Sequence, residues 1–253
     1  MKITFLGTGT SQGVPVIGCD CDVCRSDDPR DKRLRTSILI EVKEKVYVVD
    51  TGPDFRQQML NEAVHNISGI IYTHEHRDHV AGLDDIRPIN YLKQKPIDIY
   101  GEERVLESLK QMIPYAFKEN KYPGVPDINL NQIVNQPFAI NGVEFTPIRV
   151  YHYKLPVFGF RIGDLTYITD ANYIPEEEKE KIVGSKYIIV NALRKKKHIS
   201  HFSLSESVEL VRGFSPRKAY LIHMSHQMGF HEKVNDELPE YVSLAYDGLS
   251  FEV

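Results

Sequence analysis

Short apolar runs recur along the chain, separated by polar or turn-forming residues. Most are rich in Ile, Val, Phe or Tyr and are bounded by Gly, Pro, Asn or Asp, which is the pattern of buried strands. The predicted strands cover residues 2–9, 37–42, 46–52, 69–74, 97–101, 143–150, 157–170, 187–193, 218–225 and 249–253. The polar turn Lys43–Lys45 lies between two of these runs and predicts an antiparallel hairpin.

Segments with helical spacing alternate with these strands. The predicted helices cover 55–62, 80–94, 103–117, 175–184, 204–214 and a short stretch after His231. The segment Asn120–Pro137 is rich in Pro, Asn and Gly and has no clear periodicity, so we expect a connector there. We find no linker and no low-complexity segment, and we therefore expect one α/β domain over residues 1–253, with two packed β-sheets and helices on their outer faces.

Composition narrows the class of protein. With 253 residues, of which 42% are hydrophobic, the chain can bury a sizeable core. Its formal net charge of -4 argues against a broad basic surface, so we expect no stable binding to nucleic acid. No apolar window approaches the roughly 20 residues of a membrane span, and the first residues lack the apolar core of a signal peptide. We expect a cytoplasmic protein without membrane attachment.

The stretch THEHRDH, Thr73–His79, concentrates polar side chains directly after an apolar run. Such a cluster offers nothing to a hydrophobic core, whereas a loop after a strand is a common place for chemistry. Its histidines and its aspartate are donors suited to zinc and related divalent ions. Four donors so close in sequence do not all reach one ion easily, so two ions that take further donors from elsewhere are expected.

Further donors stand at comparable places in the predicted strands. His152, Asp170 and His223 each follow or end an apolar run, so all three can gather at one edge of the sheets. Taken singly, each has an ordinary alternative as a loop histidine or a turn aspartate. Together with the first cluster they favour a metal site.

The pattern H-x-H-x-D-H, formed by His74, His76, Asp78 and His79, resembles the signature of the metallo-β-lactamase superfamily. The resemblance extends over essentially the whole chain and implies that family's αββα sandwich. It implies a first ion held by His74, His76 and His152, a second held by Asp78, His79 and His223, and Asp170 between them. Zinc and manganese are the expected ions. Asp50 is expected to support the metal loop by hydrogen bonding, and Asp78 has a second interpretation as a helix N-cap.

All three cysteines of the chain lie in GCDCDVC, as Cys19, Cys21 and Cys24. The spacing is too tight for a normal disulfide framework, and three thiolates need one more ligand to complete a tetrahedral structural zinc site. We choose His226 as the fourth ligand; the alternative is that the cysteines are simply small buried side chains. The combination of GCDCDVC with HMSHQ resembles the phosphoribosyl cyclic phosphate phosphodiesterase branch of the superfamily, which carries an extra structural zinc.

Catalysis by such a centre needs a proton donor for the leaving oxygen. In the family comparison His201 falls at the position of the general acid, and Asp78 is the second residue expected to be catalytic; His198 is the neighbouring alternative to His201. The basic stretch of Arg194, Lys195, Lys196 and Lys197, with His198, is a candidate phosphate-binding segment or an ordinary solvated loop.

The leading hypothesis is a two-metal phosphodiesterase that acts on a small phosphodiester, cyclic esters included. The resemblance also implies a homodimer, which is common among relatives. Three alternatives stay open: an RNA 3′-processing endonuclease of the ribonuclease Z type, an acyl (thioester or lactam) hydrolase, and a metal-stabilised binding protein without catalysis. The early GTGTSQGVP lacks the Lys-Ser/Thr ending of a phosphate-binding loop, so no nucleotide cofactor is expected.

Overall fold

Two seven-stranded β-sheets form the centre of the protein, which we describe from a computed structural model that covers residues 1–253. The first sheet has the order β14 (Ser250–Glu252), β1 (Lys2–Gly7), β2 (Ser37–Val42), β3 (Lys45–Val49), β4 (Gly69–Ile71), β5 (Ile97–Gly101) and β6 (Ile128–Gln132). The second has the order β13 (Val242–Leu244), β12 (Lys218–Ile222), β11 (Tyr187–Asn191), β10 (Leu165–Ile168), β9 (Leu155–Ile162), β8 (Val143–His152) and β7 (Phe138–Ile140). Each sheet mixes parallel and antiparallel pairs.

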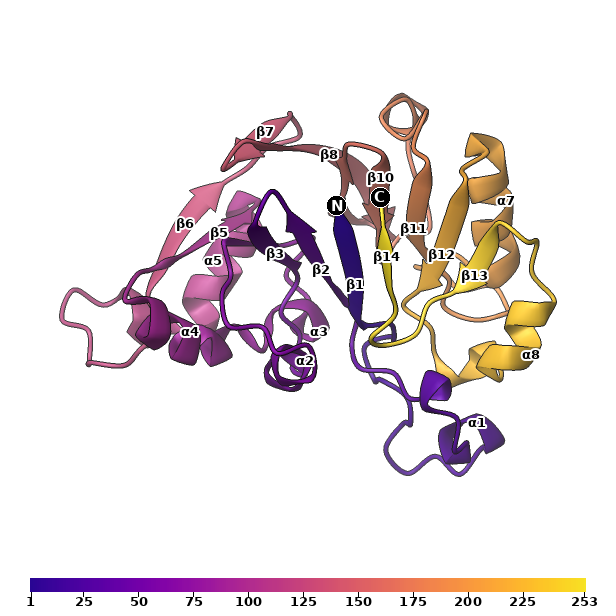
Figure 1. The fold of residues 1–253 in the computed structure, drawn as a ribbon, viewed down its shortest axis with the longest axis horizontal. Helices are drawn as coiled ribbons and strands as arrows, with labels where there is room; N and C mark the ends of the chain where they lie inside the picture. Colours follow the sequence, from indigo (N-terminus) through magenta and orange to yellow (C-terminus); the bar gives the residue numbers. More distant parts are fainter.

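Helices cover the outer face of each sheet (Figure 1). The α-helices are α1 (Asp22–Arg25), α2 (Phe55–Asn61), α3 (Arg77–Val80), α4 (Arg87–Lys93), α5 (Glu103–Met112), α6 (Glu176–Lys179), α7 (Leu204–Phe214) and α8 (His231–Asp236). Single 3₁₀ turns are η1 (Pro29–Asp31), η2 (Leu83–Ile86), η3 (Pro114–Phe117) and η4 (His226–Met228). Helices α2 to α5 lie against the first sheet, and α7 and α8 lie against the second.

Three hydrophobic clusters fill the spaces between these layers. One joins the inner faces of the two sheets, with Phe5 of β1 and Phe160 of β9 among its members. The other two lie between a sheet and its helices, and include Leu109 of α5 and Val211 of α7. Layers of helix, sheet, sheet and helix bury both faces of both sheets, so the predicted αββα sandwich is confirmed.

Three short strands were not predicted from the sequence: β6, β7 and β13. Strand β6, INLNQ, lies inside the segment 120–137 that was expected to be a connector. It is an edge strand that pairs in parallel with β5, and most of its side chains are at least partly exposed. Polar side chains are tolerated there because one edge faces solvent, so the apolar pattern that marks a buried strand is weak.

The expected helix over 80–94 is divided into α3, η2 and α4. Gly82 lies at the division, and a Cβ atom on it would stand 2.1 Å from the carbonyl oxygen of Gly52. A Cβ atom added to Gly52 would likewise stand 2.2 Å from the carbonyl oxygen of Asp78. The chain therefore bends where two loops meet backbone to backbone, and this contact holds the loop after β3 against the metal-binding motif.

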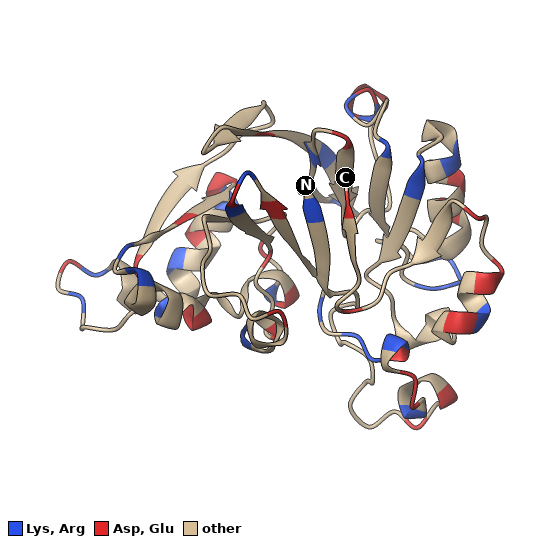
Figure 2. Cartoon of the chain, in the orientation of Figure 1, with Lys and Arg blue, Asp and Glu red and all other residues tan.

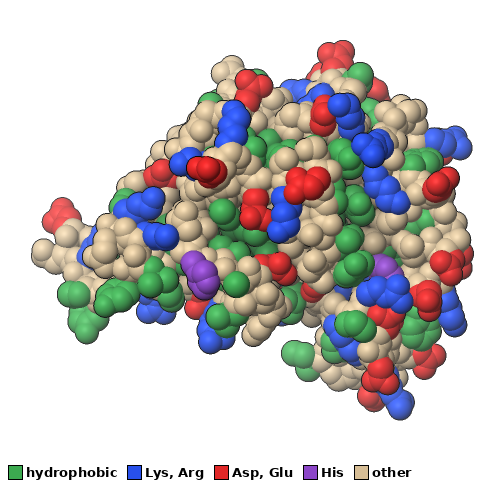
Figure 3. Space-filling model, viewed as in Figure 1, with side chains coloured by type: hydrophobic (Ala, Val, Ile, Leu, Met, Phe, Trp, Pro, Cys, Tyr) green, Lys and Arg blue, Asp and Glu red, His purple; other side chains and the backbone are tan.

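Charged side chains of both signs are interspersed over the molecule (Figure 2). On the face drawn in Figure 3, acidic, basic and apolar patches alternate without a broad area of one sign. No helix of the chain is both long enough and apolar enough to cross a bilayer.

Candidate metal centre

The motif THEHRDH runs from just after β4 into the first residues of α3. Strand β4 ends at Ile71, and Asp50 follows the parallel neighbour β3, so the ends of the two strands place these polar residues together. Asp50 accepts the backbone N–H of Thr73 at 2.9 Å and its hydroxyl at 2.8 Å. It also accepts Nδ1–H of His79 at 2.7 Å. Asp50 thus supports the loop by hydrogen bonding, as predicted.

Asp78, His79, Asp170 and His223 form one group of donors, whose ligand atoms lie within 4.8 Å of one another. His79 Nε2 is 3.1 Å from Asp170 Oδ2 and 3.3 Å from Asp78 Oδ2. His223 Nε2 is 3.3 Å from Asp170 Oδ1. Asp170 also shares a second donor group with His152 and His201, so its carboxylate lies beside donors of both proposed ions.

Strand ends aim these side chains. Asp50, Asp170 and His223 follow β3, β10 and β12, and all three have left-handed φ values of 65°, 54° and 58°. Non-glycine residues adopt this region rarely, Asp and His more readily than most, and strained backbone of this kind recurs at functional sites. The turn of the backbone at each strand end directs the side chain toward the common centre.

His74, His76 and His152 form the neighbouring part of the centre. Their ring centroids are 4.7 Å apart for His74 and His76, 5.2 Å for His76 and His152, and 6.1 Å for His74 and His152. The Thr73 hydroxyl donates to Asp50, so His74 Nδ1–H donates to that hydroxyl, at 2.9 Å. His152 Nδ1–H donates to the carbonyl of Ser200 at 2.8 Å. Both histidines therefore hold the tautomer that leaves Nε2 free to bind a metal.

The chemistry of the donor set fits divalent cations. Nε2 of His74 and His79 and Nδ1 of His201 and His223 are buried without a hydrogen-bond partner. A buried polar atom left in this condition is unfavourable by about 1–3 kcal/mol. Of these nitrogens, His79 Nε2 lies beside the carboxylates of Asp78 and Asp170, and His201 Nδ1 lies 3.9 Å from Asp170, so a bound cation would satisfy them.

The pKa shifts of these residues also favour a bound cation. Burial lowers the pKa of His74 well below its usual value and also lowers that of His223, so both imidazoles are neutral, as a ligand must be. Burial alone would raise the pKa of Asp170, but His223 and His79 outweigh it and hold that pKa well below the usual range. Against the effect of burial, Asp170, Asp78 and Asp50 raise the pKa of His79. The carboxylates that hold a proton there would equally attract a metal cation.

A second group of ligands lies outside this centre. Sγ of Cys19 and of Cys21 are each 3.3 Å from His226 Nδ1, and Sγ of Cys24 is 3.5 Å from it. Helix α1 carries Cys24, and η4 begins at His226, so two distant short elements meet at this point. Three sulfurs around one imidazole nitrogen suit a tetrahedral zinc ion.

His201 is buried, with 8% of its surface exposed. Its ring lies between those of His152, at 4.5 Å, and His223, at 4.9 Å, and its Nδ1 is 3.9 Å from Asp170 Oδ1. Burial, and then the repulsion that a protonated His223 would exert, lower the pKa of His201 to about 3. The residue is therefore within the centre and neutral in the protein alone.

The basic stretch 194–197 is largely engaged within the protein. Arg194 donates to the side chain of Gln227 at 2.7 Å and to carbonyls of its own loop. Lys195 pairs with Glu237 at 2.7 Å, and Lys197 with Glu206 at 3.5 Å. Lys196 makes no such contact. His198 accepts from the Ser200 hydroxyl at 3.2 Å, and its ring lies 5.3 Å from that of His201. Most of these cations brace the loop that carries His201.

Two threonines at the centre have contacts that the sequence did not indicate. Thr73 joins Asp50 to His74, and the hydroxyl of Thr10 is 3.2 Å from His223 Nε2. Thr10 comes from GTGTSQGVP, which we considered from the sequence only as a phosphate-binding loop and rejected. Its sequence neighbours gave no sign of the contact, because His223 is 213 positions away.

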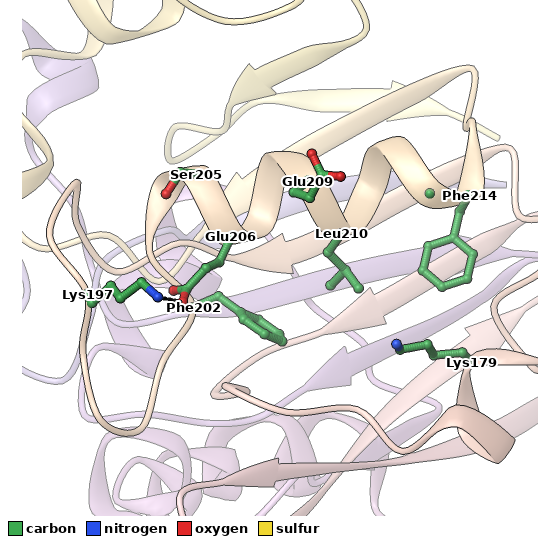
Figure 4. Close-up of a pocket in the computed structure, with 9 residues that line it drawn as sticks. Lys179, Lys197, Phe202, Ser205, Glu206, Glu209, Leu210 and Phe214 are labelled. Carbon is green, nitrogen blue, oxygen red and sulfur yellow. Dashed lines mark ion pairs between the residues drawn. The ribbon is translucent and has the colours of Figure 1, made fainter.

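A surface hollow of ≈ 820 Å³ lies beside α7 and not over the donors. Figure 4 shows Leu210 and Phe214 of α7 facing it, with Lys197 paired to Glu206 at one end. Phe202, the neighbour of His201, also lines it. None of the metal-donor residues belongs to its lining, so the donors and not the hollow locate the chemistry.

Comparison with known proteins agrees with this geometry. Residues 45–224 match the model of the beta-lactamase superfamily domain. A crystal structure described as a new diphosphatase from the PhnP family superposes with a TM-score of 0.93 at 36% identity, over 100% of this chain and 97% of that one. The chain belongs to the PhnP family. That branch lies within the metallo-β-lactamase superfamily, as the sequence resemblance implied.

Two further comparisons qualify what this PhnP-family chain shares with its relatives. The octanoyltransferase of Porphyromonas gingivalis is 38% identical over 252 residues, which are 98% of this chain and 51% of that protein. The chain thus spans about half the length of that relative. Zn(2+)-bound PqqB from Methylobacterium extorquens superposes with a TM-score of 0.79 at 19% identity, over 100% of both chains, and shows the shared fold.

Proposed function

We propose that this metallo-β-lactamase-fold hydrolase is a two-metal phosphodiesterase acting on a small phosphodiester, cyclic esters included. The observation that carries the proposal is the convergence of buried nitrogens without partners on the carboxylates of Asp78 and Asp170. The similarity to a PhnP-family diphosphatase supports a phosphoryl substrate. Zinc or manganese is the proposed metal at this centre, with one structural zinc at the cysteine group.

In this proposal the two ions have separate ligand sets with Asp170 between them. The first ion would be held by His74, His76 and His152, and the second by Asp78, His79 and His223. When bound, two divalent ions supply a nucleophile from water at neutral pH and neutralise charge on the phosphoryl oxygens.

The protein's own residues then provide orientation and protons. Asp50 and Ser200 hold His79 and His152 in the tautomers that present Nε2 to the centre. His201 is kept neutral by burial. We propose that an anionic phosphodiester in the centre raises its pKa, so that the ring takes up a proton and passes it to the leaving oxygen. Lys196, the free cation of the basic stretch, is the residue of that stretch proposed to meet the substrate.

The test is hydrolysis of a panel of esters by the purified, metal-replete protein. Bis(p-nitrophenyl) phosphate and 2′,3′-cyclic nucleotides are the expected substrates, with turnover lost in Asp78→Ala and reduced about 10²–10⁴-fold in His201→Ala. Controls are His65→Ala, whose histidine is exposed, and Asp164→Ala, whose carboxylate pairs only with an exposed lysine. Turnover that survives Asp78→Ala, or none at all, would overturn the proposal.

An acyl hydrolase is the second candidate, because a relative at 38% identity is called an octanoyltransferase. The chain corresponds to only half of that protein, so its acyl chemistry can reside in the other half. Octanoyl thioesters in the same panel separate the two functions. Cleavage of precursor tRNA would favour the ribonuclease Z type, and metal binding without any turnover would favour a binding protein. Elution volume in gel filtration checks the proposed homodimer.

A further inference from the structure

An alternating network of four charged side chains connects the metal loop to the second sheet. Glu75, which lies between His74 and His76 in the motif, pairs with Arg104 of α5. Arg104 also pairs with Glu102 at 3.2 Å, and Glu102 pairs with Arg149 of β8. The order along the network is acid, base, acid, base, so each inner charge has a partner of opposite sign on both sides.

Arg104 is the centre of this network because its guanidinium reaches three elements. One nitrogen donates to Glu75 of the metal loop, and the other donates to Glu102 and to the backbone carbonyl of Pro156 in β9. Pro156 is the β9 partner of Tyr151, the residue before His152. One side chain therefore touches both the loop of His74 and the strand pair that ends at His152.

Two further contacts hold the same region together. Phe158 of β9 donates its backbone N–H to the carbonyl of Thr73 at 3.1 Å. The guanidinium of Arg149 lies 4.0 Å from the centre of the Phe158 ring. The network thus encloses the junction between the metal loop and β8/β9. Neither the network nor these two contacts reach Asp78 or His223, which are donors proposed for the second ion.

We infer that Arg104 is a positioning residue for the proposed ion of His74, His76 and His152, and sets the affinity of that ion selectively. The inference rests on the proposed function, because it assumes that metals occupy this centre. A planar guanidinium fork fixes both distance and angle between its acceptors, whereas a lysine ammonium supplies one flexible point charge. The side chains of Arg104 and Glu75 are 30% and 25% exposed, so the pair is partly shielded from water.

The experiment is dialysis of the purified protein against buffers of graded free zinc, with zinc per chain measured by elemental analysis. Arg104→Gln and Glu75→Gln are the test variants, and Arg104→Lys tests partial rescue. Arg87→Gln is the matched control, because Arg87 pairs with Asp84 on an exposed surface of the same region. Melting temperature is measured for each variant.

We expect Arg104→Gln to lower the affinity for one bound zinc ion about 10–100-fold, which is the usual effect of losing a group that orients metal ligands. The affinities for the other zinc ions should be unchanged. Glu75→Gln is expected to weaken binding of the same ion, with a double variant no worse than the single ones. Arg104→Lys is expected to fall between wild type and Arg104→Gln, and Arg87→Gln to match wild type.

Unchanged zinc binding in both glutamine variants would overturn the inference while leaving the proposed function intact. Equal weakening of all equivalents with a lowered melting temperature would also overturn it, because that result indicates a general structural role. A raised KM with normal zinc binding would make Arg104 a substrate-binding residue instead. Wild-type protein that takes up zinc only at the cysteine group would overturn the proposed function and this inference together.

Discussion

Asp50→Asn tests whether the hydrogen bonds behind the metal loop control metal binding. The carboxylate is fully buried and accepts three hydrogen bonds, two from Thr73 and one from His79. Asparagine has nearly the same shape and tolerates the left-handed φ of 65° at this position. The substitution therefore changes the hydrogen bonding and the charge with little change in the backbone.

The effect follows from the chemistry of the amide. Asparagine keeps one acceptor oxygen. When that oxygen accepts the hydrogen bond from Thr73, the NH₂ group of the asparagine faces His79 Nδ1. His79 then accepts at Nδ1 and carries its proton on Nε2, where the metal would bind. Loss of a hydrogen bond to a charged group changes stability by about 1.5–3 kcal/mol. Disturbing the partner of a metal-binding histidine reduces metal affinity about 10–100-fold, which is about 1.4–2.8 kcal/mol.

The assay is zinc occupancy against free zinc, followed for the wild type and for Asp50→Asn. We expect weaker binding of the equivalent that uses His79 and a lower melting temperature. Asp164→Asn is the control, because that carboxylate pairs with Lys186 at the surface. Wild-type affinity in Asp50→Asn would refute the idea that this carboxylate sets the tautomer of His79.

Three further predictions concern backbone fit, the cysteine group and pH. A Cβ at Gly82 would stand 2.1 Å from the carbonyl oxygen of Gly52, so Gly82→Ala should lower the melting temperature. Gly213→Ala in α7 is the contrasting variant, because nothing lies within 4 Å of a Cβ there, and it should stabilise the protein by about 0.5–1 kcal/mol. Cys21→Ser should remove one zinc equivalent in elemental analysis and leave the ions of the other centre in place; loss of every ion would contradict separate sites. Burial, and then nearby arginines, lower the pKa of His231 to about 4, so the unfolded chain binds its proton more tightly. The free energy of unfolding should therefore fall as pH drops from about 6.5 to about 4, by at most about 3 kcal/mol. Urea unfolding of His231→Gln should show a smaller fall over the same pH range. An equal fall in the wild type and the variant would contradict this assignment.

The sequence predicted the parts of this protein that depend on local pattern. Strands such as β4 and β12 are continuous apolar runs, and a polar residue at the end of each one is visible without a structure. His152, Asp170 and His223 were found in this way, although they lie far apart in the chain. The short edge strand β6 was missed because only Ile128 and Leu130 of its five residues pack against the core, while the other three are polar.

Contacts between distant side chains were not predictable for a different reason. The stretch 194–197 was interpreted as a phosphate-binding segment or a solvated loop, because four cations in a row show no sign of their partners. Gln227 is 33 positions from Arg194, and Glu237 is 42 positions from Lys195. The same reason kept the network around Arg104 out of view. The sequence shows which side chains are charged, but only the folded structure shows which of them form ion pairs.

The left-handed residues at the ends of β3, β10 and β12 have a consequence for protein engineering. Glycine adopts this conformation without the steric penalty of a Cβ, so glycine at Asp170 or His223 would relieve local backbone strain of about 1 kcal/mol. At Asp50 the loss of three buried hydrogen bonds would outweigh that relief. A selection for heat resistance alone would therefore favour glycine at positions that supply metal donors. Stabilising libraries for this fold should hold these three positions fixed and draw their gains from the exposed faces of the helices.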